Sequence, residues 1–217
     1  IIGMIMNRPA EDNVGLFGYT DNALIKSVVL ENCAVTGKND VGGLIGKGIA
    51  TPVYGCKFEG GMVSGSSNIG GLIGEMVDNV TISNCKNKGI INSQCASGNV
   101  GGIGGLVPSG IIKNCINVGV VKGTFSNIYY DQNVGGIAGR GTVIYCCQNF
   151  GTIFVKPANR ADSESGAIAG GVVGTADRVY KCFNSGIIQY LSTTSGSYSH
   201  CYSNAGGIAG KTTVISN

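Results

Sequence analysis

Val41-Gly42-Gly43-Leu44-Ile45-Gly46 is the first full copy of a hexapeptide that recurs along the whole chain. Copies stand at Ile69 to Gly74, Val100 to Gly105, Val134 to Gly139, Ala169 to Gly174 and Ala205 to Gly210, with a version one glycine shorter at Val14 to Gly18. The step between copies rises from 28 residues to 36. Self-similarity at roughly 20 to 50 residues indicates stacked repeats, in which each unit buries its apolar face against its neighbours. We therefore expect residues 1–217 to form one solenoid domain.

A second repeated element follows each hexapeptide: an apolar residue, two spacers, a cysteine, three more residues and a glycine. The cysteines and glycines of this element are Cys33 and Gly37, Cys56 and Gly60, Cys85 and Gly89, Cys115 and Gly119, Cys147 and Gly151, and Cys182 and Gly186. Because the separation is the same in all six copies, we expect this part of the repeat to be packed backbone that tolerates no insertion.

The apolar runs are short and β-branched, and glycine or asparagine bounds each of them, so they predict strands; no helical stripe is present. A third apolar pair, such as Ile90-Ile91, follows the second element. Three short strands per repeat predict an all-β fold, a right-handed parallel β-helix of about seven coils. We expect the paired glycines to turn corners at φ values closed to other residues. Asparagines two residues after the cysteines tolerate left-handed backbone and can bond to one another along the axis; they are Asn87, Asn117, Asn149 and Asn184.

The segment between the second element and the next hexapeptide lengthens in every copy, from Gly37–Val41 in the first to Gly186–Ala205 in the sixth. Insertions in a solenoid collect on one face, which is often the binding face. The longer segments hold aromatic residues, and the candidate ligand or partner residues are Tyr129, Tyr130, Tyr190, Tyr198 and Tyr202.

Composition narrows the function classes. Thirty-eight glycines accompany a hydrophobic fraction of 43%, which argues against disorder. The 15 basic and 12 acidic residues are scattered singly along the sequence, so nucleic-acid binding is unsupported. No apolar run is long enough to span a membrane, and Ile1 to Met6 lacks the features of a signal peptide. The chain ends on Ile215-Ser216-Asn217, which resembles the residues before a repeat cysteine, and we expect a fragment of a longer repeat protein.

The six cysteines of the second element predict a buried structural ladder, namely Cys33, Cys56, Cys85, Cys115, Cys147 and Cys182. A line of stacked thiols does not give the tetrahedral geometry of a zinc site, and no metal or cofactor is expected. Parallel stacking also holds Cβ atoms further apart than the ~3.8 Å of a disulfide. Cys146 is expected to point toward solvent and is a candidate reactive thiol.

The sequence contains only weak candidates for a catalytic site. His200 and Cys201 are adjacent in one loop, and neighbours in sequence are seldom aligned for proton transfer. The acidic residues Asp131, Asp162, Glu164 and Asp177 form no repeated cluster of the kind that glycan-cleaving β-helix enzymes use. The glycine-rich stretch at Gly101–Gly105 leads into no helix, so a phosphate-binding role is also unsupported. We do not expect an enzyme.

The hexapeptide together with Asn-Cys-x-Asn-x-Gly elements, such as Asn84 to Gly89 and Asn114 to Gly119, resembles the GLUG-type repeats. These repeats occur in large surface or secreted proteins of gut and oral bacteria, including adhesin-like proteins and the non-catalytic regions of IgA-cleaving metallopeptidases. The resemblance covers nearly the whole chain. It implies an extracellular or cell-surface scaffold or adhesive segment, and it carries no functional residues with it.

Three hypotheses on function remain. The first is a structural or adhesive rod whose C-terminal loops present tyrosines to a carbohydrate or a host protein. A passive spacer or a filament-forming subunit is the second, and a β-helix polysaccharide lyase or hydrolase is the third. We expect neighbouring repeats, caps or end-to-end copies to cover the strand edges at both ends.

Overall fold

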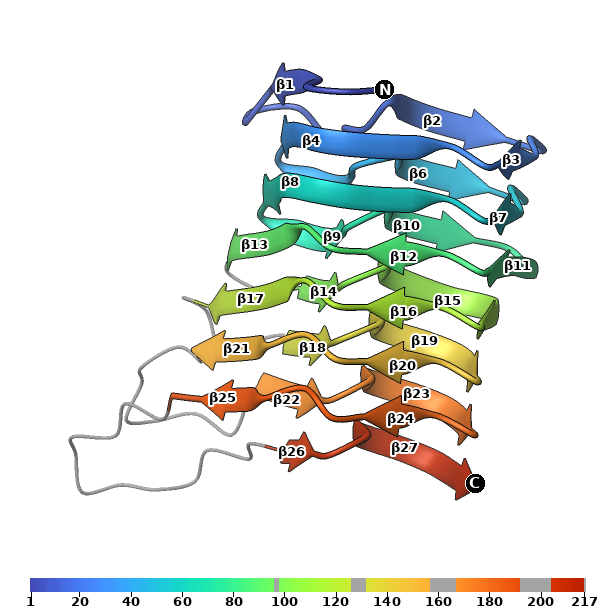
Figure 1. Ribbon diagram of the computed structural model, residues 1–217, viewed down its shortest axis with the longest axis vertical. Helices are drawn as coiled ribbons and strands as arrows, with labels where there is room; N and C mark the ends of the chain where they lie inside the picture. The colour runs from blue at the N-terminus through green and yellow to red at the C-terminus, as the bar shows by residue number, and fades with distance from the viewer. Residues whose placement is uncertain (96–97, 126–131, 157–166, 192–203, 217) are drawn as a thin grey trace.

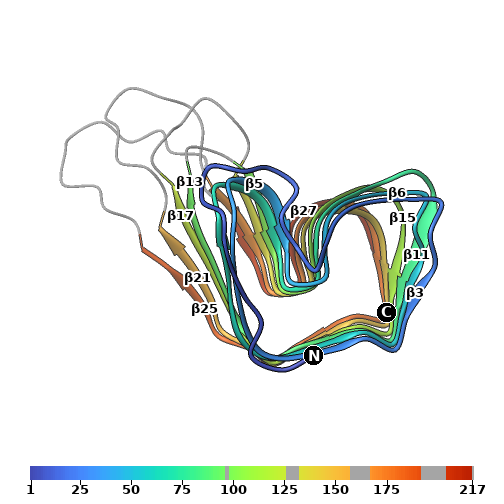
Figure 2. The same cartoon turned by 90° about the horizontal axis from the view of Figure 1, so that it is seen from above.

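The computed structural model describes residues 1–95, 98–125, 132–156, 167–191 and 204–216, which form a right-handed solenoid of parallel β-strands (Figure 1). No helix occurs in these ranges. Seen from the N-terminal end, the chain winds clockwise as it recedes from the viewer (Figure 2). All-β class, parallel pairing and handedness are therefore as predicted.

Three parallel sheets make up the walls of the solenoid. Sheet A contains β1 (Ile5–Asn7), β4 (Val29–Thr36), β8 (Lys57–Gly65), β12 (Lys86–Asn87), β13 (Ile90–Cys95), β16 (Ile116–Asn117), β17 (Val120–Phe125), β20 (Gln148–Asn149), β21 (Ile153–Lys156), β24 (Phe183–Asn184) and β25 (Ile188–Tyr190). Sheet B contains β5 (Asn39–Gly42), β9 (Ser67–Gly70), β14 (Gly98–Gly101), β18 (Gln132–Gly135), β22 (Ala167–Gly170) and β26 (Asn204–Gly206). Sheet C contains β2 (Phe17–Asp21), β3 (Ile25–Lys26), β6 (Ile45–Ile49), β7 (Val53–Tyr54), β10 (Ile73–Val77), β11 (Val80–Ser83), β15 (Gly104–Lys113), β19 (Ala138–Tyr145), β23 (Val173–Tyr180) and β27 (Ala209–Ser216).

The number of complete coils is lower than the predicted seven. Five coils, from β5–β8 to β22–β25, carry strands in all three sheets. The first repeat reaches sheet B only through an isolated bridge between Val14 and Val41. In the last repeat, the described residues supply β26 and β27 but no strand of sheet A.

The hexapeptide forms a sharp turn that joins sheet B to sheet C and folds the wall inward (Figure 2). Our explanation of its glycines by positive φ is wrong, because the described glycines with positive φ are Gly3, Gly55, Gly60, Gly61, Gly98 and Gly110, all outside the hexapeptides. Close packing requires the glycines instead. A Cβ on Gly101 would lie 2.1 Å from the carbonyl oxygen of Gly104, and one on Gly105 would lie 2.6 Å from the backbone of Asn68.

The second glycine of the turn packs against the asparagine of the other repeated element. A Cβ on Gly102 would lie 2.7 Å from Cγ of Asn117, and one on Gly136 would lie 2.4 Å from Cγ of Asn149. The two motifs of the sequence therefore meet across the interior of each coil. In the second coil, Phe58 takes the place of the asparagine and Gly43 lies against its ring.

The asparagines form the predicted ladder along the axis. Nδ2 of Asn87 donates to Oδ1 of Asn117 at 2.7 Å, Asn117 donates to Asn149 at 2.8 Å, and Asn149 donates to Asn184 at 2.7 Å. Each side chain also bonds to the backbone of the glycine two residues later, as in Gly119 N–H donating to Asn117 Oδ1 at 3.2 Å. Asn87, Asn117 and Asn149 are fully buried, so these bonds satisfy polar atoms that water does not reach. None of the four has positive φ, which corrects that part of the prediction.

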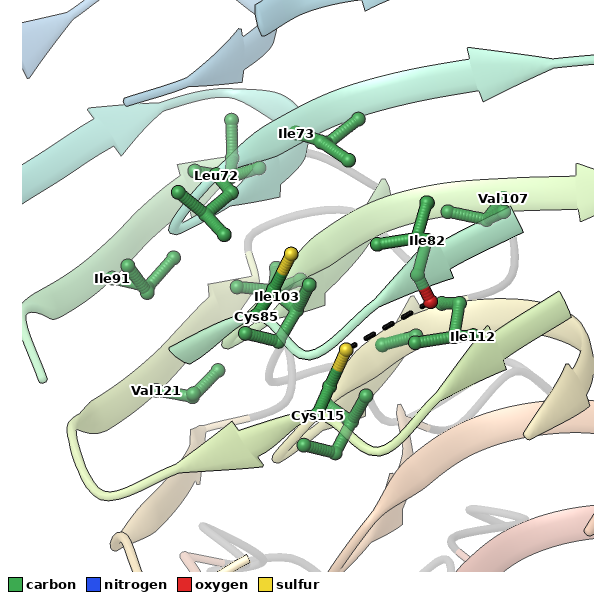
Figure 3. Close-up of a cluster of buried hydrophobic side chains, with 14 of the residues drawn as sticks. Leu72, Ile73, Ile82, Cys85, Ile91, Ile103, Val107, Ile112, Cys115 and Val121 are labelled. Atoms are coloured by element: carbon green, nitrogen blue, oxygen red, sulfur yellow. Dashed lines mark hydrogen bonds between the residues drawn. The ribbon is translucent and has the colours of Figure 1, made fainter. Parts of the chain in front are cut away.

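Rows of aliphatic side chains fill the remaining interior. One buried cluster runs from Val14 to Cys182, with isoleucine, valine or leucine stacked on the same residue types in adjacent coils. Figure 3 shows Ile82 and Ile112 on neighbouring rungs beside the sulfur atoms of Cys85 and Cys115. Each coil buries its apolar side chains against its neighbours, as a repeat architecture requires.

Candidate functional site

The segments of variable length all leave the solenoid at one corner, between a strand of sheet A and the following strand of sheet B. At this corner β4 is joined to β5, β8 to β9, β13 to β14, β17 to β18, β21 to β22 and β25 to β26. A single residue, Ser66, joins β8 to β9, whereas residues 157–166 separate β21 from β22. The strands that bound these segments lie side by side in Figure 2, as the one-face prediction requires.

Of the predicted ligand tyrosines, only Tyr190 lies in the described part of the chain. It belongs to strand β25 and not to a loop, which corrects the prediction. Its half-buried ring packs against the core and its hydroxyl donates to the carbonyl oxygen of Ala167 at 3.3 Å. Tyr190 therefore links sheet A to sheet B. The other candidates, Tyr129, Tyr130, Tyr198 and Tyr202, lie outside the described residues.

Five of the six predicted ladder cysteines stand in register and are buried: Cys56, Cys85, Cys115, Cys147 and Cys182. Each thiol donates to the carbonyl oxygen two residues earlier, at distances from 3.1 Å for Cys182 to 3.5 Å for Cys56. Burial raises the pKa of the Cys56 thiol to about 11. A buried thiol that donates in this way packs as a small apolar group with a satisfied donor.

Cys33 is buried but is not part of that row, which corrects the prediction. Leu30 pairs with Phe58 and Cys33 with Gly61, so Val28 occupies the position that Cys56 holds in the next coil. Two rows of aligned residues, one containing Leu30 and the other Val35, run through the first three coils. Between these two rows, each of the first two coils has one residue more than the third coil. Gly60 and Gly61, at φ of 99° and 98°, absorb this residue as a bulge in β8. The spacing from Cys33 to Gly37 therefore equals that of the other copies, although Cys33 does not occupy the same structural position.

The residue just before each ladder position turns the corner from sheet C to sheet A. These corner residues all have positive φ, between 48° and 62°: Ser27, Gly55, Asn84, Asn114, Cys146 and Lys181. Cys146 is thus held in a left-handed turn, half-buried and without a disulfide, beside the buried Cys147. Its expected orientation away from the core agrees with this position.

Lysines cluster on the outer surface of the corner between sheets C and A. We define the basic corner as three rows of residues on the outer side of the strands, of which Ser83 is buried at 2% exposure. The rows are Lys26, Tyr54, Ser83, Lys113, Tyr145, Tyr180 and Ser216 on sheet C; the corner residues themselves; and Val29, Lys57, Lys86, Ile116, Gln148 and Phe183 on sheet A. Lys26, Lys57 and Lys181 are exposed, and Lys86 and Lys113 are half-buried. The lysines are far apart in the sequence, but the repeat period aligns them, so reading the charges as scattered missed this stripe.

A second polar ladder, which the sequence analysis missed, lies on sheet B. Asn68 donates to Asp40 at 2.8 Å, Asn99 to Asn68 at 2.8 Å, and Asn133 to Asn99 at 2.9 Å. Thr175 of sheet C donates to Asn133 at 2.6 Å and so links the two sides of the inward fold. Burial raises the pKa of Asp40, against the opposing effect of its bond from Asn68. The signal in the sequence was a recurrent asparagine or aspartate directly before the hexapeptide.

No set of three or more histidine, cysteine, aspartate or glutamate side chains is placed to hold a metal ion within the described ranges. Asp177 is exposed on β23, whereas His200, Cys201, Asp131, Asp162 and Glu164 fall outside those ranges. The part of the chain that the structure describes has no helix that could cross a membrane. Comparison with protein families, with curated proteins and with solved structures gives no match.

Proposed function

We propose that the chain is an extracellular structural and adhesive repeat module of a bacterial surface protein, of the GLUG type that its motifs resemble. One observation carries the proposal: the interior rows are the same from the third coil to the sixth, whereas the exterior changes from coil to coil. The cysteine and asparagine rows repeat without a break from the third coil to the sixth. Outside, lysine, tyrosine and phenylalanine replace one another on the same rows. A constant core with a variable surface is the arrangement of a scaffold that presents binding groups.

The two ends of the solenoid support contact with further β-structure. Ile2 is 75% exposed at the N-terminal end, and Ile187 and Ile215 are 60% and 53% exposed near the C-terminal end. An unpaired strand edge with apolar side chains is a template for pairing. We propose that neighbouring repeats, caps or a second copy cover these edges. Sedimentation of the chain over a range of concentrations tests self-association.

Adhesion is tested by measuring retention of the chain on arrays of immobilised glycans and host extracellular proteins. We expect retention on at least one class of surface. Replacing Tyr129, Tyr130, Tyr198 and Tyr202 with alanine tests the predicted loops, and Tyr190→Phe is a control that keeps the packed ring but removes its hydroxyl. Loss of retention in the fourfold variant alone assigns binding to the loops. Absence of retention by the unaltered chain on every surface contradicts adhesion and leaves the passive spacer.

A further inference from the structure

The basic corner concentrates positive charge. Its three rows hold five lysines, Lys26, Lys57, Lys86, Lys113 and Lys181, and no carboxylate. The formal net charge of the whole chain is only +3, so the rest of the chain is net negative. The first four of these lysines come from four successive coils, which stack about 4.8 Å apart. The fold therefore builds a continuous positive stripe parallel to the solenoid axis.

No carboxylate stands on the three rows of this stripe, and Glu31 and Glu59 lie on the next outward row of sheet A. Two lysines on other rows have carboxylate partners, Lys47 with Glu75 at 2.8 Å and Lys88 with Glu59. Within the described ranges, no such ion pair involves the five lysines of the basic corner. Lys57 and Lys86 are direct neighbours in register, and like charges in that arrangement destabilise a sheet. An internal structural role does not explain why these two lysines are neighbours despite their repulsion, whereas binding of an external anion does.

Aromatic side chains continue the same rows. Tyr54 lies between Lys26 and Ser83, and Tyr145 and Tyr180 are neighbours in register. The ammonium group of Lys181 lies 5.9 Å from the centre of the Tyr145 ring, so charge and aromatic surface meet there. On the sheet A side, Phe183 is 51% exposed and contacts Phe150, with ring centres 5.8 Å apart. Aromatic rings with a broad apolar face and, for tyrosine, a polar tip suit the faces of sugar rings.

We propose that the basic corner binds a linear acidic polysaccharide, which lies along the solenoid axis. Its carboxylate or sulfate groups contact the lysines, and its sugar rings pack against Tyr145, Tyr180 and Phe183. All five cations of the corner are lysines. Lysines act as point charges toward anionic groups, which suits the dispersed carboxylate or sulfate groups of such a chain. The inference rests on the proposed adhesive function and names the ligand class for it.

The test uses the full chain and fluorescently labelled oligosaccharides of polygalacturonate and of hyaluronate, with neutral dextran as a reference. We expect binding at low ionic strength that weakens as salt is added, since exposed charges are screened. The variant with Lys57→Gln, Lys86→Gln and Lys113→Gln should bind at least about tenfold more weakly. A matched variant with Lys38→Gln, Lys122→Gln and Lys211→Gln loses the same charge on other rows and should bind within about twofold of the unaltered chain.

Four outcomes overturn the inference. Equal weakening in both triple variants assigns binding to net charge and not to the basic corner. Tighter binding of a single-stranded DNA of equal charge assigns the corner to nucleic acid. Absence of binding to either acidic oligosaccharide at low salt removes the ligand class. Retention on host surfaces that the corner variant leaves unchanged overturns this inference but not the adhesive function, so the two failures are distinguishable. Circular dichroism spectra and thermal midpoints check that both variants fold.

Discussion

At the scale of single residues, the hexapeptides require glycine where two backbones approach, and not where φ is unusual. Three glycines of the hexapeptide at Val100 to Gly105 face different partners: Gly101 faces a carbonyl of the same turn, Gly102 the ladder asparagine, and Gly105 the backbone of the preceding coil. Six residues at the corner between sheets C and A take left-handed torsions, but only one of them is a glycine. Cβ-bearing residues tolerate that torsion at a modest cost, whereas a Cβ has no space inside the turn.

Gly102 and Gly104 provide a matched test of this explanation. A Cβ on Gly102 would lie 2.1 Å from the carbonyl oxygen of Gly136, so Gly102→Ala should lower the free energy of unfolding by about 3 kcal/mol. A Cβ on Gly104 would lie 3.0 Å from the side chain of Val107 and 4.0 Å from the carbonyl oxygen of Ile73, and the paired residues of adjacent coils are Ile73 and Ala138. Gly104→Ala should therefore change stability by less than about 1 kcal/mol. Urea denaturation of the two variants measures the difference, and equal losses would refute the packing explanation.

Asp40 is the first residue of the second polar ladder, on sheet B, and makes the stability of the protein depend on pH. Its folded-state pKa lies above 3.8 because burial disfavours the charged carboxylate. Ionisation of Asp40 therefore destabilises the folded state progressively as the pH rises through 3.8 toward the folded-state value. Asp40→Asn keeps an acceptor for Asn68 and removes this charge, so the variant should be slightly more stable than the unaltered chain at neutral pH. Thermal midpoints should converge well below pH 3.8, where Asp40 is protonated; a gain that persists there would contradict the electrostatic cause.

At the scale of elements, the strands of sheets A and B fix where the chain can vary. Pairing on both sides of the corner continues from β8 and β9 to β21 and β22 although the connection lengthens. The connection of one residue at Ser66 demonstrates that the corner can close tightly. The length of the connection between sheets A and B is therefore independent of the packing of the core.

Replacing residues 157–166 with Gly-Ser tests that independence. We expect the shortened chain to fold and its free energy of unfolding to change by less than about 1 kcal/mol, because loop closure depends weakly on length. Deleting Val155 alone is the control. Val155 is buried in β21, and a slip of one residue turns the inward side chains of a strand outward. Deletion of one strand residue should thus destabilise the protein more than replacement of residues 157–166, and the reverse order of unfolding midpoints would contradict the independence of connection length and core.

At the scale of the whole molecule, stability is a sum over neighbouring coils. Each strand pairs only with the same strand of the coils before and after it, so coils at the ends have one neighbour and central coils have two. The basic corner extends over several coils, which makes it a property of the stack and not of a single repeat.

Hydrogen exchange should show a gradient along the axis. We expect the amides of β10, β15 and β19 to exchange slowest and those of β2 and β27 to exchange fastest, since local opening needs less free energy at the ends. Exchange measured by NMR or by mass spectrometry of peptides reports this order. Uniform protection from one end to the other would indicate a single cooperative unit in place of coupled coils.

The amino-acid sequence by itself determined the solenoid, the common corner of the variable segments, and the interior rows from Cys85 and Asn87 onward. It did so because a constant period places like residues above one another, whatever the detailed cross-section. Only the tertiary structure decided that Val28 and not Cys33 precedes Cys56 in its row, since a bulge of one residue leaves no periodic signal. It likewise decided what surrounds Gly102, where Tyr190 packs, and that five isolated lysines form one stripe, because these depend on contacts through space between residues that are distant along the chain.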